Sequence, residues 1–435
     1  MGKTALALKL ADELAPRFPD AQLYVDLRGV SEKPLTSGEA MAFVVRAFHP
    51  EAKLPEGEAE LSAAYQTVLH GQRALLLLDN ARDAAQVKPL LPSKSCVLLV
   101  TSRQQFALHG LRPKHLDALP PADAEALLRE IEPRIGNEAA RIAQLCGYLP
   151  QALRLAAGSL LERPSLEPAD YARRLSDEKK RLDLLKVGDS KASDQSMAAS
   201  IELSCSLLDA EMQRRWRALA VFPDTFHAPA AAAVWAIEDD VAQDALDRLL
   251  QYSMLEWNAT ARRYRLHDLM HDFARGHWEE LEREQAARCH AVYYAGLLDT
   301  ADAFYLKGGD SIAQGLALFD LEWGNIRAGQ SWAAKHRSQD AETARLCSDY
   351  PNAGVYCLDL RLHPSDRMGW LEAALAAARH LKDRETEAVH LGNLGIRYWE
   401  MGEPRRAIEY YEQHLALSRE IDYRRGEGKA LGNLG

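Results

Sequence analysis

Apolar and polar positions alternate with two different periods along the first part of the chain. Three short apolar runs, at 22–29, 74–80 and 96–103, are separated by stretches whose apolar residues recur every three or four positions. Strands alternating with helices in this way predict an α/β domain with a parallel sheet. The second and third runs are unbroken and end in polar residues, which is typical of strands buried on both faces. Those polar ends should line the sheet edge where such domains bind ligands.

The chain from residue 121 onward is mainly helical in period, with one exception. The segment SMLEWNATARRYRLHD predicts two short strands joined by a turn near Asn258. Helices followed by such a hairpin are the outline of a winged helix. With the prolines of ERPSLEP and the polar run after them as breaks, we expect four domains. They are an α/β domain at 1–120, a small helical domain with its linker at 121–190, a winged helix at 191–284 and a helical region at 285–435.

The C-terminal region contains an internal repeat. The sequence LGNLG at 391–395 recurs 40 residues later at 431–435, and Pro364 and Pro404 stand at the same offset. Such helix pairs bury their faces by stacking, so we predict an α-solenoid of units similar to tetratricopeptide repeats, longer than the usual ~34 residues. The repeats would bind a protein partner. Four aromatic residues at helical spacing are expected to pack between repeats: Trp370, Trp399, Tyr410 and Tyr411.

Composition and charge narrow the classes of function. The 435 residues are 47% apolar and 27% charged, as in a multidomain globular protein. The net charge of −10 gives no positive field for phosphate backbones, so nucleic acid is not an expected partner of this chain. The six cysteines lack metal-ligand spacing, and no apolar run reaches the ~18 residues of a membrane span. We therefore expect reduced thiols, a cytoplasmic location and no membrane contact.

The first residues resemble part of a phosphate site. Gly2, Lys3 and Thr4 precede an apolar helix and match the last three positions of a P-loop, in which Lys3 would meet the β- and γ-phosphates and Thr4 the Mg²⁺. Asp79 ends an apolar strand as a Walker B carboxylate does, and would also hold Mg²⁺. Arg103 ends the next strand. Taken singly, Asp79 could instead be a helix cap and Arg103 a surface cation; the three motifs in this order favour a bound nucleotide, ATP or ADP.

Six segments, taken together, resemble a known family. They are GKTALA, LYVDLRG, LLLLDNA, LLVTSR, CGYLPQALRLAA and YRLHDLMHDFA. In this order and at these intervals they look like NB-ARC-type signal-transduction ATPases, the STAND branch of the P-loop NTPases. The resemblance covers residues 1–280, and tetratricopeptide repeats often follow in the bacterial regulators of this type.

The resemblance implies roles for further residues. Arg103 would sense the terminal phosphate, and Pro150 would lie against adenine. His267 would contact the β-phosphate of ADP and lock the winged helix onto the nucleotide. From the residues alone, Pro150 is also a suitable first residue of a helix, and His267 could simply cap the helix after it. Asn80 stands where many relatives carry a second acid, so we expect at most a slow ATPase unless Asp83 substitutes for that acid.

The resemblance also predicts that the chain is a fragment. The family places a buried strand and the glycine-rich half of the phosphate loop before the residues seen here, and the final repeat ends as it begins. Fewer amide donors would then surround the phosphates, so we expect this polypeptide alone to bind nucleotide weakly. A submicromolar affinity for ATP or ADP in calorimetry would refute this expectation.

Three functions follow from these features. In the first, ADP holds the winged helix, and exchange for ATP releases it so that protomers of the complete protein assemble. In the second, the chain is a tetratricopeptide scaffold that does not hydrolyse nucleotide. In the third, it is the sensor part of a transcriptional regulator whose DNA-binding domain is missing. The segment 237–250 carries five acidic residues against Arg248 alone, so this winged helix is not expected to bind DNA itself.

Overall fold

A computed structural model describes most of the chain, in two compact units. The described residues are 2–29, 34–50, 54–55, 57–92, 94–102, 104, 106–114, 116, 118–184, 192–362 and 364–435, with the backbone alone at 179–184, 192–195 and 364. The first unit comprises residues 1–217 with 243–277, and the second comprises 218–242 with 278–435. The four predicted domain boundaries stay predictions.

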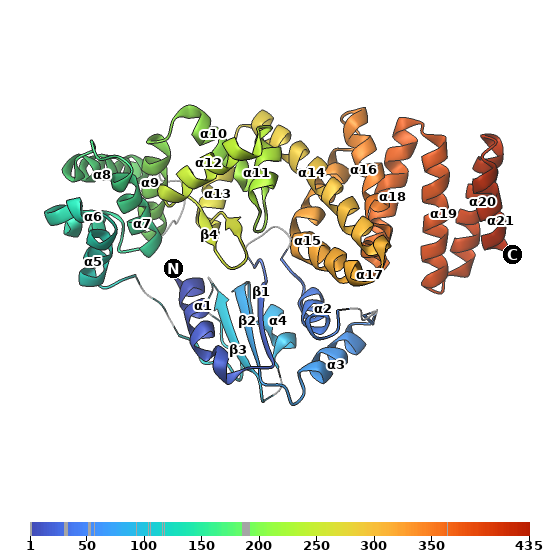
Figure 1. The fold of residues 1–435 in the computed structure, drawn as a ribbon, viewed down its shortest axis with the longest axis horizontal. Coiled ribbons are helices and arrows are strands. Elements are labelled where there is room, and N and C mark those ends of the chain that lie inside the picture. The colour runs from blue at the N-terminus through green and yellow to red at the C-terminus, as the bar shows by residue number, and fades with distance from the viewer. Residues whose placement is uncertain are drawn as a thin grey trace. The chain divides into compact units, whose positions relative to one another are not determined.

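The first unit contains a parallel three-stranded sheet in the order β1-β2-β3 (Figure 1). The strands are β1 (Ala21–Asp26), β2 (Ala74–Ala81) and β3 (Val97–Ser102). All eight residues of the central strand β2 are buried, as its unbroken apolar sequence predicts. In the register of β1 and β2, Asp26 lies opposite Asp79. The carboxyl ends of these two strands therefore bring two acids to one edge of the sheet.

Short helices flank this sheet. They are α1 (Lys3–Leu14), η1 (Ala15–Arg17), α2 (Ser37–Phe48), α3 (Glu58–Leu69), α4 (Ala84–Val87) and η2 (Lys88–Leu90). Helix α1 contacts β2 and β3, whereas α2 contacts β1 and α3 (Figure 1). Thr36 and Glu39 form a reciprocal capping box that starts α2. Tyr65 of α3 is fully buried and donates to the carbonyl of Leu90 at 2.7 Å, which ties α3 to η2.

Helices and one hairpin complete the first unit. These elements are α5 (Pro121–Ile131), η3 (Pro133–Glu138), α6 (Ala139–Leu145), α7 (Pro150–Leu161), α8 (Pro168–Leu184), α9 (Ala192–Ser206), α10 (Ala210–Ala218), α12 (Asp239–Gln251), β4 (Glu256–Asn258), β5 (Arg263–Arg265) and α13 (Asp268–Gly276). Strands β4 and β5 are antiparallel, and the Asn258 side chain accepts from the amides of Thr260 and Ala261, so the predicted turn is confirmed. The division between units cuts α12. That residues 191–284 form a winged helix stays a prediction.

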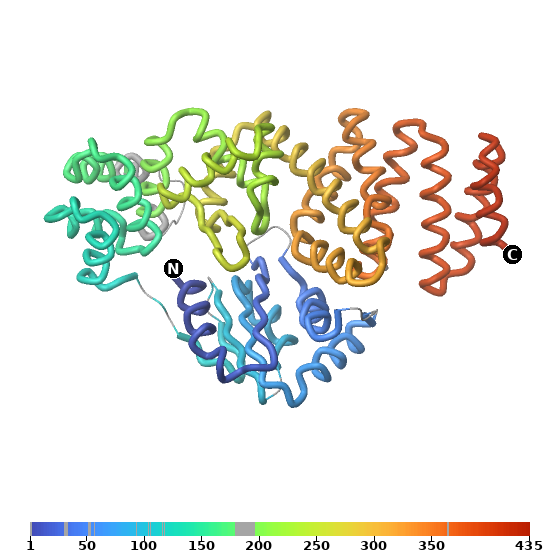
Figure 2. The backbone as a smooth tube through the Cα atoms, in the orientation of Figure 1, coloured from blue at the N-terminus to red at the C-terminus, as the bar shows by residue number. Residues whose placement is uncertain are grey.

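The second unit is helical. Its elements are η4 (Leu219–Val221), α11 (Ala228–Trp235), α14 (Glu280–Lys307), α15 (Asp310–His336), α16 (Ala341–Ala353), α17 (Val355–Arg361), α18 (Pro364–Leu381), α19 (Arg384–Glu400), α20 (Pro404–Glu420) and α21 (Arg424–Leu434). The last four helices follow one another as antiparallel neighbours (Figure 2). Pro364 and Pro404, 40 residues apart, each begin a helix, and Lys382 and Asp422, at the same offset, both have a positive φ. The predicted helical repeat is confirmed.

The glycines of the first LGNLG copy, Gly392 and Gly395, lie at a close contact between α19 and α20. A Cβ atom at Gly395 would lie 2.4 Å from a ring carbon of Tyr411, and one at Gly392 would lie 2.8 Å from the His414 ring. Only a residue without a side chain lets α20 approach α19 so closely. Trp370 is also buried and stacks on Trp323 between helices, as expected. The same expectation is wrong for Trp399, whose side chain is 60% exposed.

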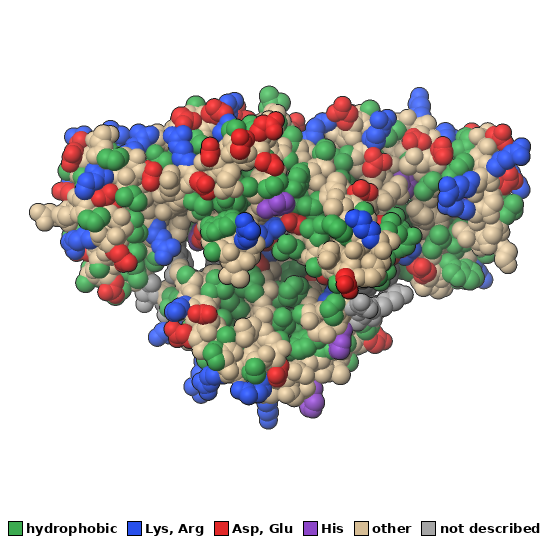
Figure 3. All heavy atoms as spheres, viewed as in Figure 1, with side chains coloured by type: hydrophobic (Ala, Val, Ile, Leu, Met, Phe, Trp, Pro, Cys, Tyr) green, Lys and Arg blue, Asp and Glu red, His purple; other side chains and the backbone are tan. Residues whose placement is uncertain are grey.

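The described residues also bear on charge, metals and membranes. Acidic and basic side chains are interspersed over the face in view in Figure 3. None of the six cysteines, all of which the structure describes, is bridged; that their thiols are reduced stays a prediction. Within the described ranges, no three His, Cys, Asp or Glu side chains are grouped so that they could hold a metal ion. In the same ranges, no helix has the length and apolar character needed to cross a bilayer.

Candidate functional site

The Asp79 carboxylate is the centre of a polar cluster at the end of β2. Its side chain is only 1% exposed. Oδ1 accepts from the Thr4 hydroxyl at 2.8 Å and from the Thr101 hydroxyl, and Oδ2 accepts from the Tyr24 hydroxyl at 3.1 Å. Asp79 is not the cap of α4, the helix that follows β2, because Asp83 caps that helix. Three hydroxyl donors therefore satisfy the hydrogen-bonding capacity of a carboxylate that water hardly reaches.

The N-terminus of α1 lies at the same end of the sheet. Gly2 has a left-handed backbone (φ 76°), which turns the chain into the helix that begins at Lys3. Ala7 packs inward one turn later and is the buried residue of α1. This placement brings the Thr4 hydroxyl to Asp79, and the neighbouring Lys3 is half-buried. Free amides and the positive end of the helix dipole favour an anion at this position.

Pro150 lies near this helix start although it is distant in the sequence. It is the first residue of α7, so its interpretation as a helix-starting proline is confirmed. Its Cγ atom lies 3.9 Å from the position that a Cβ atom on Gly2 would take. The ring of Pro150 is therefore a neighbour of the predicted phosphate loop. Its contact with adenine stays a prediction.

Asn80 and Asp83 have structural roles after β2. Asn80 has a positive φ of 55°, and its amide donates to the Thr101 hydroxyl at 3.0 Å. Its carbonyl accepts from the amide of Gly29, where a Cβ atom would lie 2.4 Å from that same oxygen. Asp83 accepts from the amide of Gln86, and this hydrogen bond lowers the pKa of its carboxyl group. Asp83 is therefore engaged as a helix cap; its substitution for the missing acid stays untested.

Arg265 of strand β5 reaches the same cluster, although no sequence pattern singled it out as a site residue. Its guanidinium lies 3.3 Å from the Asp26 carboxylate, 3.1 Å from that of Asp268 and 3.9 Å from that of Asp79. It also donates to the Tyr24 hydroxyl at 3.3 Å. Burial lowers the pKa of Arg265, but the surrounding acids, Asp26 first, raise it well above its usual value. The guanidinium is thus a fixed positive charge among three carboxylates.

Tyr24 and Asp26 were also missed as site residues. The Tyr24 ring is 39% exposed, while its hydroxyl is enclosed between Asp79 and Arg265. Burial of that hydroxyl, followed by the charge of Asp26, raises the pKa of Tyr24 above its usual value. Both residues belong to LYVDLRG, in which alternate positions of β1 share a face. That alternation was the available signal, because it places Tyr24 and Asp26 on the same side.

His267 has a local role in the structure. It stands just before α13, and its Nδ1 accepts from the amide of Leu269 at 3.2 Å. The capping interpretation is therefore confirmed, and the contact with a β-phosphate stays a prediction. Arg103, the predicted phosphate sensor, lies outside the described residues.

The donor atoms around Asp79 suit a magnesium ion. Mg²⁺ prefers oxygen ligands and commonly takes one or two protein groups, with phosphates and water completing its shell. The Thr4 hydroxyl and the Asp79 carboxylate supply such oxygens within 2.8 Å of each other. The positive charge of Arg265, 3.9 Å from the same carboxylate, opposes a second cation there. Thr4 and Asp79 therefore fit Mg²⁺ once the Arg265 guanidinium has moved away from Asp79.

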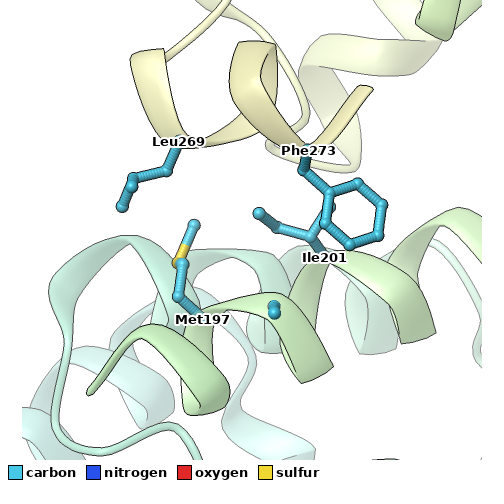
Figure 4. Close-up of a pocket in the computed structure, with 5 residues that line it drawn as sticks. Met197, Ile201, Leu269 and Phe273 are labelled. Atoms are coloured by element: carbon cyan, nitrogen blue, oxygen red, sulfur yellow. The ribbon is translucent and has the colours of Figure 1, made fainter. Parts of the chain in front are cut away.

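A separate cavity of about 190 Å³ lies between α9 and α13 (Figure 4). It is lined by Met197, Ala198, Ile201, Leu269 and Phe273. These apolar side chains offer no group that could bind a phosphate or a metal. The cavity is therefore distinct in chemistry from the cluster around Asp79.

The curated proteins to which this chain is similar include several regulatory proteins. The chain is 38% identical over 333 residues to the regulatory protein AfsR of Streptomyces coelicolor, which covers 73% of this chain and 33% of that protein. AfsR of Streptomyces griseus is 37% identical, covering 70% of this chain and 31% of that protein. An HTH-type transcriptional regulator of Mycobacterium tuberculosis, Rv0890c, is 25% identical over 97% of this chain and 49% of its own length.

Two further matches are to a repeat family and to a solved structure. Residues 369–420 match the tetratricopeptide repeat family. A solved STAND protein with a tetratricopeptide repeat sensor, from Pyrococcus horikoshii, is 13% identical with a TM-score of 0.40, covering 97% of this chain and 78% of that one. The chain spans about a third of the length of the AfsR proteins it matches. It is a homologue of the AfsR-type regulatory proteins and carries a tetratricopeptide repeat near its C-terminus.

Proposed function

We propose that the chain is the nucleotide-responsive part of a bacterial signalling regulator. The observation that carries the proposal is the pairing of Thr4, at the start of α1, with the buried Asp79 at the end of β2. These two residues are 75 positions apart, and only the predicted nucleotide site requires both. The kinship with AfsR-type regulators supports the signalling role.

The proposal assigns a role in nucleotide binding to the residues at the start of α1 and to their neighbours. The amides of α1 and the Lys3 ammonium bind the phosphates, with the helix dipole adding a partial positive charge. Thr4 and Asp79 hold Mg²⁺, which screens phosphate charge when bound. Pro150, beside Gly2, limits the space for the base. Because Asn80 cannot accept a proton, turnover is slow or absent.

Nucleotide exchange would act as the switch. The segment around His267 binds the ADP state more tightly than the ATP state, and this difference in affinity supplies the energy for release. Release of the segment then permits assembly of the complete protein. His267 would make this contact from the position just before α13, where its ring already accepts a hydrogen bond from the amide of Leu269.

The tetratricopeptide repeats would bind a protein partner. Several large apolar side chains on α19, α20 and α21 are exposed, among them Trp399 at 60%, Ile408 at 43% and Leu431 at 48%. Exposed apolar groups of this size on a repeat surface are suited to protein contacts.

The proposed contact between Lys3 and the phosphates is tested by titrating a fluorescent ADP analogue into the chain with Mg²⁺ present. We expect measurable binding that a Lys3→Ala variant weakens by about tenfold or more, because one charge-assisted contact is lost. Lys9→Ala is the matched control, since Lys9 is an exposed residue of the same helix, 68% accessible. Equal loss in both variants, or no loss in either, would contradict the proposal.

The lock is tested at His267 with two variants that keep the helix cap. Asn and Asp both cap helices well, so His267→Asn and His267→Asp should fold like the parent. A carboxylate near the β-phosphate repels ADP, whereas an amide does not. We expect faster ADP release from His267→Asp than from His267→Asn, and in the complete protein His267→Ala should favour assembly. Equal ADP off-rates in all variants would exclude the lock.

A second candidate function is the sensor part of a transcriptional regulator. The match to an HTH-type regulator along 97% of this chain favours it. The acidic residues of α12, Asp239, Asp240, Asp244 and Asp247, are exposed, which argues against DNA binding through that helix. A scaffold that does not use nucleotide hydrolysis is the remaining alternative. Single-turnover hydrolysis by the complete protein separates it from a switch, because a scaffold should give only background.

A further inference from the structure

Arg265 connects two segments that are far apart in the sequence. It belongs to the short hairpin β4–β5, and its partners Tyr24 and Asp26 lie on β1, about 240 positions earlier. Its third and fourth partners are Asp79 on β2 and Asp268 at the start of α13. The side chain is 24% exposed, so most of its contacts are shielded from water. Shielding strengthens the attraction between the guanidinium and these acids.

Asp79 cannot hold Mg²⁺ and pair with Arg265 at the same time without bringing two positive charges close together. In the proposed function Asp79 holds a divalent cation, while the structure holds a guanidinium 3.9 Å from its Oδ2. The other oxygen of Asp79 already accepts from Thr4 and Thr101. A magnesium ion on Asp79 would therefore lie within a few ångströms of Arg265, and two cations at that separation repel strongly where water is scarce.

We propose that Arg265 and a divalent cation exclude each other at Asp79, so that Arg265 is a latch which holds the β4–β5 hairpin to the sheet until the cation binds. This inference rests on the proposed function, because it assigns Asp79 to the metal. It adds a residue that competes with the metal ion for the Asp79 carboxylate. Binding of Mg²⁺ and nucleotide is thereby coupled to movement of the segment that carries His267.

The identity of the latch residue follows from the geometry of its partners. A guanidinium presents several N–H donors in a plane, which lets one side chain serve acids on β1, β2 and α13 together. Asp26 is held in place for this contact by the amide of Arg28, which donates to its other oxygen at 2.8 Å. Without Arg265, the carboxylates of Asp26, Asp79 and Asp268 would lose the guanidinium that all three contact. A divalent cation held by Asp79 and Thr4 would then meet no competing positive charge.

Two readouts on the 435-residue chain test the latch. The variant is Arg265→Gln, and the matched control is Arg262→Gln, which changes an exposed arginine in the turn of the same hairpin. Hydrogen exchange of residues 256–265 without nucleotide reports whether the hairpin is held. Titration with Mn²⁺ alone, followed by electron paramagnetic resonance, reports cation affinity independently of nucleotide.

We expect Arg265→Gln to exchange about tenfold to a hundredfold faster in the hairpin, because hydrogen bonds to charged partners are lost. Its Mn²⁺ affinity should rise about tenfold or more, because a neighbouring positive charge is gone. Arg262→Gln should change neither quantity. Arg265→Lys keeps the charge, so it should keep the weak Mn²⁺ affinity while loosening the hairpin.

Several outcomes would overturn the inference. Unchanged exchange of the hairpin in Arg265→Gln would show that no latch exists, and an unchanged Mn²⁺ affinity would show that the two cations do not compete. Slow exchange of β2 in every variant checks that the fold persists. A chain that binds Mn²⁺ as expected but no nucleotide would instead count against the proposed function and leave the competition standing.

Discussion

Replacing Thr101 by valine removes a hydroxyl that two other groups use. Thr101 is 8% exposed at the end of β3. Its hydroxyl donates to Oδ1 of Asp79 and accepts from the amide of Asn80 at 3.0 Å. Valine has nearly the same shape but neither donates nor accepts, so both partners lose a contact in a site that water hardly reaches.

The size of the effect follows from these two bonds. A hydrogen bond to a charged group contributes about 1.5–3 kcal/mol and one between neutral groups about 0.5–1.5 kcal/mol. Their sum predicts that Thr101→Val destabilises the sheet by about 2–4.5 kcal/mol. Thr101→Ser keeps the hydroxyl and removes one methyl group, which costs about 0.8 kcal/mol. The two variants should therefore differ clearly.

Hydrogen exchange of the β2 amides measures this difference where it arises. The tryptophans all lie beyond residue 215, so their fluorescence does not report on the sheet. At about 1.4 kcal/mol per factor of ten, Thr101→Val should speed exchange about 30- to 1,600-fold and Thr101→Ser about fourfold. Exchange in Thr101→Val within about threefold of the parent chain would refute the assignment of both bonds.

Three further predictions concern packing, burial and pH. Gly395→Ala should destabilise the repeats by about 1–3 kcal/mol in thermal unfolding, because the new methyl group meets the Tyr411 ring; Gly428→Ala, on α21 with no atom near its Cβ position, should be neutral or stabilising. Gln86→Ala should cost about 2 kcal/mol by hydrogen exchange, because its amide group serves three backbone groups. Burial lowers the pKa of His390 to about 4, against about 6.5 in the unfolded chain. Neutral His390 therefore contributes its full share to the free energy of unfolding above pH ~6.5, and this share falls by about 1.4 kcal/mol per pH unit down to pH ~4. In urea unfolding, the stability of a His390→Gln variant should fall less steeply with decreasing pH than that of the parent chain.

Local patterns predicted much of the fold. The run ALLLLDN indicated a strand buried on both faces, and β2 is such a strand. The recurrence of LGNLG indicated stacked helix pairs, and the glycines of its first copy lie where α20 packs closely on α19. These features depend on residues that are close in sequence or on spacings that repeat. Trp399 was misassigned because residue type does not say which face of a stacked helix remains outside.

The site could be predicted only in part. Strand ends and a helix start bring Thr4 and Asp79 together by topology alone, so sequence order was sufficient for that pair. The contact of Arg265 with Asp26 joins residues 239 positions apart through the packing of a hairpin. No periodicity encodes such a contact. The cap formed by His267 was foreseen as one of two interpretations, and a local hydrogen bond does not decide whether a ligand also binds there.

The most direct test of the central claim is the magnesium dependence of nucleotide binding in an Asp79→Asn variant. Asparagine keeps the size of the side chain and can still accept hydrogen bonds, but it lacks the charge that holds Mg²⁺. A fluorescent ATP analogue should bind the parent chain more tightly with Mg²⁺ than without it, and Asp79→Asn should lose that difference. If the variant and the parent gain equally from Mg²⁺, Asp79 does not hold the metal and the proposed site is wrong.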